Sequence, residues 1–161
     1  MLFNLFKKET LKIYAPVNGE VIPLEEVPDP VFSQKMMGEG VAVIPEGGDI
    51  CAPVDGTVIL VADTQHAIGI RSKDGTEVLV HVGLETVALE GKGFDVLVQK
   101  GDDVSAGQRL MAVDWEYIRT NAESTITPIV ITNGQETGKQ YTFTGDKKGV
   151  AGETVIATSA K

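Results

Sequence analysis

The fold is indicated by Ala15-Pro16-Val17-Asn18-Gly19-Glu20-Val21-Ile22, which returns as Ala52-Pro53-Val54-Asp55-Gly56-Thr57-Val58-Ile59. In each copy a proline stands where a strand begins, so its missing N–H does no harm, and an Asn-Gly or Asp-Gly turn leads into a β-rich run. Weaker copies of the repeat, at residues 104–110 and 150–155, each place a glycine before another such run. The repeat predicts duplicated hairpin units that form two interlocked halves.

Short apolar runs rich in Val and Ile, with Gly or Pro near their ends, fill much of the chain. Runs of this length and composition predict strands rather than helices. They cover residues 40–45, 56–61, 68–71, 78–82, 109–113 and 128–132. Asp114 is a good N-cap and predicts one short helix from Trp115 to Asn121. We therefore expect an all-β fold, an antiparallel β-sandwich or barrel with at most one or two short helices.

Length, charge and cysteine content narrow the class of protein. The 161 residues fit one domain, which we expect at residues 13–161 behind a flexible N-terminal arm at residues 1–12. A net charge of −9 argues against binding of a nucleic acid, because an acidic surface repels phosphates. The single cysteine, Cys51, excludes an internal disulfide, indicates a reducing compartment and is interpreted as a small buried hydrophobe.

The sequence contains no apolar run long enough for a membrane-spanning helix. Residues 1–8, Met-Leu-Phe-Asn-Leu-Phe-Lys-Lys, place their positive charges after the apolar side chains, whereas a secretory signal has them before. The segment is interpreted either as a frayed terminus or as a short, weak anchor. Either interpretation predicts a cytoplasmic protein.

Both histidines of the chain, His66 and His81, fall at one predicted hairpin. If residues 72–75 form its loop, His66 stands directly opposite His81. If only Asp74 and Gly75 turn, His81 faces Ile68 and His66 lies on the diagonal. In both registers the two imidazoles share one face of the sheet, within reach of one another.

Paired imidazoles suit a metal ligand, a general base or a nucleophile, whereas a lone His81 after its apolar run would be read as a core residue. A catalytic zinc needs a third protein ligand, which Glu85 could supply. A Ser-His-Asp triad is excluded because the G-x-S-x-G turn is absent. The residues therefore favour a histidine pair with one nucleophile, with zinc binding as a minor alternative.

Residues 75–87, Gly-Thr-Glu-Val-Leu-Val-His-Val-Gly-Leu-Glu-Thr-Val, resemble the active-site signature of the glucose-type enzyme IIA domain. This family belongs to the bacterial phosphoenolpyruvate-dependent sugar phosphotransferase system. The similarity covers nearly everything from about Ile13 onward, in order and with the family's spacing. It continues through residues 15–19, 27–32, 37–40, 52–57, 64–67, 89–94 and 127–133.

The resemblance implies an antiparallel β-sandwich with a shallow apolar depression around the two histidines. His81 matches the histidine that is phosphorylated on Nε2, and His66 matches the one that hydrogen-bonds the phosphoryl group. Thr64 matches the threonine that orients the second ring. The Gly83 carbonyl would accept a hydrogen bond from Nδ1 of His81, which leaves Nε2 free to attack. No cofactor is implied.

The resemblance also implies two partners. The phosphohistidine carrier protein HPr would give phosphate to His81, and a cysteine on the IIB domain of a sugar permease would receive it, for glucose-type uptake. Apolar side chains and an acidic rim around the depression would dock these proteins. By position the docking residues are Val31, Phe32, Met36, Met37, Leu79, Glu85 and Val87, and the acidic residues are Asp29, Glu39 and Glu85.

For Leu79 and Val87 a core role is equally open. The chain departs from the family at Glu85, where aspartate is frequent, and at Pro30, where the family has an aliphatic residue; both could tune partner choice.

Further alternatives stay open. The repeated hairpins also resemble those of biotinyl and lipoyl carrier domains, with Lys35 beside Met36 and Met37 as the modified lysine. A zinc peptidase of related architecture would need further ligands beyond His66 and His81, which this chain lacks. A regulatory role, in which the protein binds transporters or kinases according to its phosphorylation state, could coexist with phosphoryl transfer.

Overall fold

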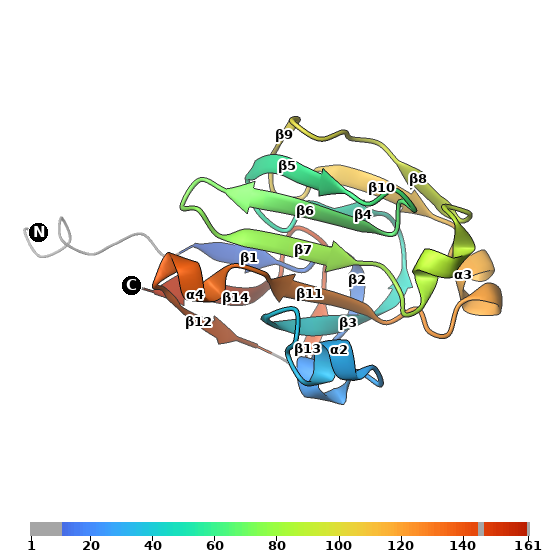
Figure 1. Ribbon diagram of the computed structural model, residues 1–161, viewed down its shortest axis with the longest axis horizontal. Coiled ribbons are helices and arrows are strands. Elements are labelled where there is room, and N and C mark those ends of the chain that lie inside the picture. Colours follow the sequence, from blue (N-terminus) through green and yellow to red (C-terminus); the bar gives the residue numbers. More distant parts are fainter. Residues whose placement is uncertain (1–10, 145–146, 161) are drawn as a thin grey trace, which may run out of the picture.

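The computed structural model, which describes residues 11–144 and 147–160, confirms the all-β fold (Figure 1). Its largest sheet has eight strands in the order β13-β2-β3-β11-β7-β6-β5-β9, and neighbouring strands are antiparallel. The strands are β2 Asn18–Pro23, β3 Glu39–Gly47, β5 Gly56–Val61, β6 Ala67–Ser72, β7 Glu77–His81, β9 Asp103–Val104, β11 Thr127–Ile131 and β13 Lys147–Gly149.

Two three-stranded sheets, ordered β1-β14-β12 and β4-β10-β8, complete the sandwich. Their strands are β1 Lys12–Tyr14, β4 Ile50–Cys51, β8 Phe94–Val96, β10 Arg109–Val113, β12 Gln140–Phe143 and β14 Val155–Ala160. In Figure 1, β4, β10, β1 and β14 lie behind the large sheet. The main core fills the space between the sheets, with fully buried side chains such as Ile13, Ile50, Ile68, Ile70, Leu110, Met111 and Ile156.

The main strands follow the sequence prediction within two residues at each end. α3 spans Trp115–Asn121 as predicted, and the Asp114 side chain accepts a hydrogen bond from the Tyr117 N–H at 3.0 Å. The described residues contain more helical segments than the one or two expected, because single turns show no periodicity in the sequence. These are η1 Leu24–Glu26, α2 Pro30–Ser33, η2 Thr86–Leu89 and α4 Gly134–Thr137.

Each copy of the repeat is hydrogen-bonded to one of the two weaker copies at residues 104–110 and 150–155. The Asn18 side-chain oxygen accepts a hydrogen bond from the Ala151 N–H at 2.8 Å, and the Asp55 carboxylate accepts one from the Ala106 N–H at 2.7 Å. Asn18 and Asp55 occupy equivalent positions in the two repeats, and their partners Ala151 and Ala106 occupy equivalent positions in the two weaker copies.

The backbone repeats the same correspondence. The Gly152 N–H donates to the Ala15 carbonyl at 2.9 Å, and the Gly107 N–H donates to the Ala52 carbonyl at 2.8 Å. The two halves meet at these glycines, since a Cβ on Gly152 would lie 2.9 Å from the Cα of Gly107. The predicted interlocking of two hairpin-based halves is confirmed.

A second, smaller apolar cluster covers the opposite face of the large sheet. It joins Leu24 and Phe32, from the η1–α2 segment, to Leu79 of β7 and Val130 of β11. The Asp29 side chain caps α2 by accepting from the Val31 N–H at 3.0 Å. The cluster brings Phe32 beside the carboxyl end of β7.

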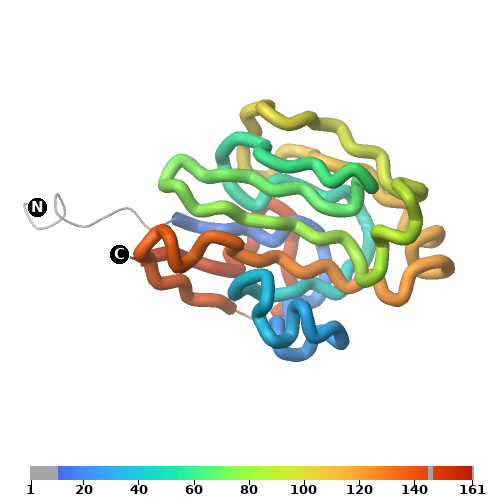
Figure 2. The backbone as a smooth tube through the Cα atoms, in the orientation of Figure 1, coloured from blue at the N-terminus to red at the C-terminus, as the bar shows by residue number. Residues whose placement is uncertain are grey.

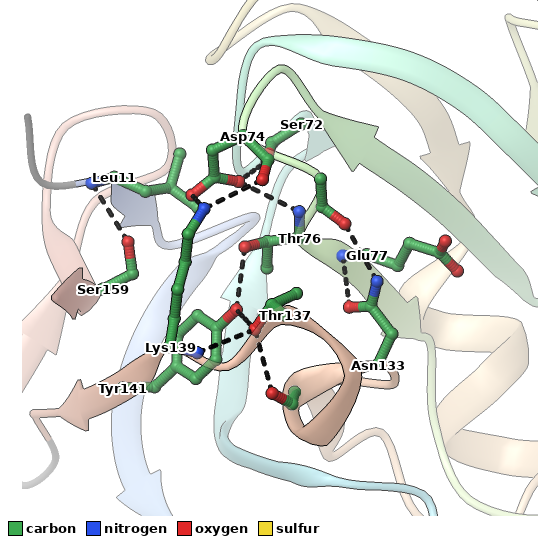
Figure 3. Close-up of polar contacts among 12 residues, drawn as sticks. Leu11, Ser72, Asp74, Thr76, Glu77, Asn133, Thr137, Lys139, Tyr141 and Ser159 are labelled. Carbon is green, nitrogen blue, oxygen red and sulfur yellow. Dashed lines mark hydrogen bonds and ion pairs between the residues drawn. The ribbon is translucent and has the colours of Figure 1, made fainter. Parts of the chain in front are cut away.

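Polar contacts tie the β6–β7 turn to the segment around β12 (Figure 3). Asp74 and Lys139 form an ion pair at 2.8 Å. The Thr76 hydroxyl lies 2.9 Å from the Tyr141 hydroxyl, which lies 2.9 Å from the Thr137 hydroxyl. These contacts fix the turn of the β6–β7 hairpin, which is the end far from His81 at the carboxyl end of β7.

β1 and β14 pair side by side, with Lys12 opposite Thr158. The Leu11 N–H donates to the Ser159 hydroxyl at 3.2 Å, and the Ser159 N–H donates to the Leu11 carbonyl at 3.0 Å. Residues 11 and 12 of the expected arm thus belong to this pairing, and residues 1–10 lie outside the described residues. Figure 2 shows the start of β1 and the end of β14 together, across the molecule from the carboxyl end of β7.

Candidate functional site

His81 is the last residue of β7, and its ring is held by the backbone that follows. Its Nδ1 lies 2.9 Å from the carbonyl oxygen of Gly83. Because a carbonyl oxygen can only accept a hydrogen bond, Nδ1 carries the proton and Nε2 carries the lone pair. The half-buried ring is therefore fixed in the tautomer that makes Nε2 a nucleophile.

Gly83 reaches this position through a backbone conformation that other residues rarely adopt. Its φ is +78°, and an added Cβ would lie 2.5 Å from the Thr86 methyl carbon and 2.9 Å from the Ser124 carbonyl oxygen. The next residue, Leu84, donates its N–H to that same carbonyl at 2.9 Å. Both the turn and its close packing require glycine.

His66 lies in the turn between β5 and β6 and is 9% exposed. Its Nδ1 is 2.7 Å from the hydroxyl of Thr64, so the threonine orients the ring. Gln65, between them, has a φ of +62°, which folds the turn tightly enough for this contact. The two side chains are therefore in direct contact, and the role of this pair in phosphoryl transfer stays a prediction.

The two imidazoles meet edge to face. Their ring centroids are 4.8 Å apart at an interplanar angle of 77°. The Phe32 ring packs against His81 from another side, with centroids 5.0 Å apart at 60°. An aromatic ring from α2 and a second histidine thus fix the His81 ring and limit its access to water.

Both hairpin registers considered from the sequence are wrong. Arg71 pairs with Glu77 rather than residue 76, which places Ala67 opposite His81. The cause is a three-residue loop, closed by the Ser72 N–H donating to the Thr76 carbonyl at 2.8 Å. Gly75 supplies the left-handed residue that such loops favour, with a φ of +93°.

The histidines nevertheless come together, although a shift of one residue would separate two side chains that both lay within paired strands. His66 precedes β6 and belongs to a turn, so the alternation of faces along a strand does not direct its side chain. The Val82 N–H donates to the His66 carbonyl at 2.8 Å and places the two residues side by side.

Burial first, and the neighbouring His66 ring second, lower the pKa of His81 from 6.5 to about 4, against the opposing effects of the Gly83 carbonyl and Asp29. Burial also lowers the pKa of His66. Both rings are therefore neutral at neutral pH, and a neutral imidazole with its proton on one nitrogen is a competent nucleophile at the other.

Within residues 11–144 and 147–160, no three His, Cys, Asp or Glu side chains gather in a way that could hold a metal ion. Glu85, considered as a third zinc ligand, is exposed, and its φ is +59°. Lys35, the modified lysine of the biotinyl alternative, follows α2 and forms an ion pair with Glu25 at 3.4 Å. Cys51 is half-buried on β4, more exposed than the buried hydrophobe we expected.

The proposed docking residues divide by exposure. Met36, Val87 and Val31 are 68%, 54% and 38% exposed, whereas Phe32 and Leu79 are 3% and 6% exposed. Leu79 thus has the core role, and Phe32 offers its ring to His81 rather than to solvent.

The rest of that set and the acidic rim lie nearer the surface. Met37 is half-buried against the second cluster, and Glu85 and Glu39 are exposed. Asp29 is half-buried as the cap of α2, and Pro30, one of the two departures from the family, is the first residue of that helix.

Sequence reasoning missed two supports of His81. The edge contact of Phe32 depends on how α2 packs, which no local pattern reveals. Thr86 lies within the quoted signature, but its fully buried hydroxyl, which donates to the Val82 carbonyl at 2.6 Å, was not singled out. Its spacing of four residues from Val82 was the available signal.

No helix among the described residues has both the length and the apolar character needed to cross a membrane.

Comparison with known proteins places these features in a family. Residues 11–137 match the model of the phosphoenolpyruvate-dependent sugar phosphotransferase system EIIA 1 family. The chain is 51% identical over 129 residues to the glucose-specific EIIA component of Staphylococcus epidermidis, a match covering 80% of this chain and 78% of that protein.

The match to the glucose-specific EIICBA component of Staphylococcus carnosus is 60% over 121 residues, 75% of this chain and 18% of that protein. The chain thus spans about a fifth of the length of the EIICBA relatives it matches. Among solved structures, the glucose permease IIA from Mycoplasma capricolum superposes with a TM-score of 0.86 at 38% identity, covering 94% of this chain and 96% of that one.

Proposed function

The chain belongs to the EIIA 1 family of the phosphoenolpyruvate-dependent sugar phosphotransferase system, a family of phosphotransferase components, and from this premise we propose that it carries a phosphoryl group on Nε2 of His81. The observation that carries the proposal is the hydrogen bond of 2.9 Å from His81 Nδ1 to the Gly83 carbonyl. It assigns the proton to one nitrogen and the nucleophilic lone pair to the other.

In the transfer step, the phosphoryl group arrives on a histidine nitrogen of the donor protein. The Nε2 lone pair of His81 attacks the phosphorus in line with the N–P bond to that donor nitrogen. The new N–P bond forms as the donor bond breaks, and the donor imidazole leaves with its electron pair. The His81 ring gains positive charge because its Nδ1 proton stays in place. The Gly83 carbonyl, already hydrogen-bonded to that proton, stabilises the charge as it develops.

His66 holds the transferred group without forming a bond to phosphorus. The Thr64 hydroxyl lies 2.7 Å from Nδ1 of His66. We infer that the hydroxyl donates to Nδ1, so that the ring carries its proton on Nε2 and donates it to a phosphoryl oxygen. The ring centroids are 4.8 Å apart, so one phosphoryl group can contact both imidazoles. We infer that His66 stabilises the group during its release more than during its acceptance.

The donor is the phosphohistidine carrier protein HPr and the acceptor is a cysteine of a IIB domain, within a cytoplasmic pathway of glucose-type sugar uptake. Relatives named as glucose-specific components support this assignment. Val31, Met36 and Val87 provide exposed apolar surface for both partners in turn. Exposed acidic residues such as Glu39 and Glu85 would speed the encounter with a basic partner surface.

Intact-mass measurement tests the proposal. The protein is incubated with phosphoenolpyruvate and the purified general proteins of the system, as wild type, His81→Ala and His66→Gln. We expect one acid-labile phosphoryl adduct on wild type, none on His81→Ala, and an adduct on His66→Gln that passes poorly to a IIB domain. If wild type stays unmodified while HPr in the same tube is phosphorylated, the proposal is wrong.

A further inference from the structure

Thr86, in η2, is completely buried although its side chain is polar. Its hydroxyl donates a hydrogen bond of 2.6 Å to the carbonyl oxygen of Val82, four residues earlier. A buried hydroxyl in such a contact holds its acceptor firmly, because breaking the bond would leave two polar groups without partners.

The peptide groups on both sides of Val82 are therefore fixed. The Val82 N–H donates to the His66 carbonyl at 2.8 Å, and the Val82 carbonyl accepts from Thr86 at 2.6 Å. The second of these peptide planes also contains the Gly83 nitrogen. Its orientation sets the point from which the Gly83 carbonyl turns back toward His81 Nδ1.

The Thr86 methyl group acts on the same turn. It lies 2.5 Å from the position of an added Cβ on Gly83, so it packs closely against the glycine Cα. Glycine populates positive and negative φ about equally, and the observed φ of +78° depends on what surrounds it. The hydroxyl holds the preceding carbonyl while the methyl fills the space beside the glycine.

We propose that Thr86 is a positioning residue for phosphoryl transfer: it holds the Gly83 carbonyl against Nδ1 of His81 and so keeps Nε2 as the reactive nitrogen. The inference rests on the proposed function of His81. Without the Thr86 hydroxyl, the peptide between Val82 and Gly83 can rotate, and Nδ1 loses its fixed acceptor. The Nε2–H tautomer, which has no lone pair at the attacking atom, is then populated.

Two substitutions separate the contribution of the Thr86 hydroxyl from that of its methyl group. Thr86→Val keeps the shape and removes the hydroxyl, whereas Thr86→Ser keeps the hydroxyl and removes the methyl. Thr76→Val is the matched control. Thr76 is also fully buried, and its hydroxyl contacts Tyr141 at 2.9 Å (Figure 3). It immediately precedes β7 and lies five residues before His81, roughly 17 Å away at the rise of an extended strand.

The first readout is the pair of ¹⁵N chemical shifts of the His81 ring at neutral pH. In wild type, Thr86→Ser and Thr76→Val, we expect a protonated Nδ1 and an unprotonated Nε2. In Thr86→Val, both shifts should move toward the average of the two tautomers. The second readout is the single-turnover rate of phosphate acceptance, which should fall about 10-fold in Thr86→Val, as when a partner that orients a functional histidine is lost.

All variants are compared in sucrose, which favours the folded state, and Thr86→Ala replaces Thr86→Val if the latter does not fold. Unchanged ¹⁵N shifts in the variant that lacks the hydroxyl would overturn the inference, as would an equal loss of rate in Thr76→Val. The shifts are read on unphosphorylated protein. Failure of the proposed function would instead appear as a wild type that accepts no phosphate.

Discussion

Lowering the pH should destabilise the protein through His81. The pKa of this residue is lowered from 6.5 to about 4 in the folded chain, by burial first and by the neighbouring His66 ring second. In the unfolded chain the ring regains its ordinary pKa. Between these two values the unfolded state binds a proton that the folded state does not.

The sign and the size follow from this difference. The stability contributed by a neutral His81 is fully present above pH 6.5 and is lost as the pH falls toward about 4. A shift from 6.5 to about 4, at about 1.4 kcal/mol per unit, corresponds to about 3 kcal/mol. Burial also lowers the pKa of His66, so its contribution has the same sign.

Urea unfolding, followed by the fluorescence of the single tryptophan, Trp115, measures this loss. Wild type and His81→Gln are compared at about pH 7.5 and about pH 4.5. We expect the free energy of unfolding to fall by about 2 kcal/mol more in wild type than in the variant. An equal fall in both proteins would show that the buried ring is not held neutral, and the assignment of its nucleophilic tautomer would lose its support.

Further predictions concern the glycine turn, the hairpin tip and the docking surface. Gly83→Ala should lower the free energy of unfolding by about 3 kcal/mol and slow phosphate acceptance, because it combines positive-φ strain with a collision at the Ser124 carbonyl. Gly138→Ala is the control, since Gly138 has a φ of +68° and open space around it; in the same urea assay it should lower the free energy of unfolding by the strain alone, about 1 kcal/mol. Burial raises the pKa of Asp74, but hydrogen bonds from Lys139, Ser72 and Thr76 outweigh this effect and lower the pKa from 3.8 to about 2. Asp74→Asn should therefore lower the free energy of unfolding by about 1 kcal/mol at neutral pH. The difference from wild type should shrink as the pH falls from 3.8 toward 2. Val87→Asp should weaken docking of HPr about 10-fold by titration, whereas Leu97→Asp, at an aliphatic residue that is similarly exposed but outside the docking set, should not; equal effects would contradict the docking surface.

Local signals predicted most of the fold. The β-branched runs gave strands whose ends were correct within two residues, and the Asp114 cap gave the start of α3. The hairpin register could not be obtained in this way. It depends on whether Gly75 closes a loop of two, three or four residues, and the observed three-residue loop has no unique sequence signature.

The site was predictable only in part. The signature resemblance singled out His81, His66, Thr64 and Gly83, and the structure brings these four residues together. It could not reveal that Phe32 packs on the His81 ring, because that contact depends on the packing of α2 across a sheet. Burial of Leu79 is likewise a property of the second apolar cluster, not of the strand pattern.

The pairing of β1 with β14 sets how the molecule would respond to a pulling force. Lys12, at the start of β1, is opposite Thr158, near the end of β14, and Leu11 and Ser159 are joined by two hydrogen bonds. Tension between the two ends would load these bonds one after another, as in a zipper, rather than all at once in shear. Mechanical opening would therefore begin at low force at this edge, far from the histidines at the carboxyl end of β7 (Figure 1).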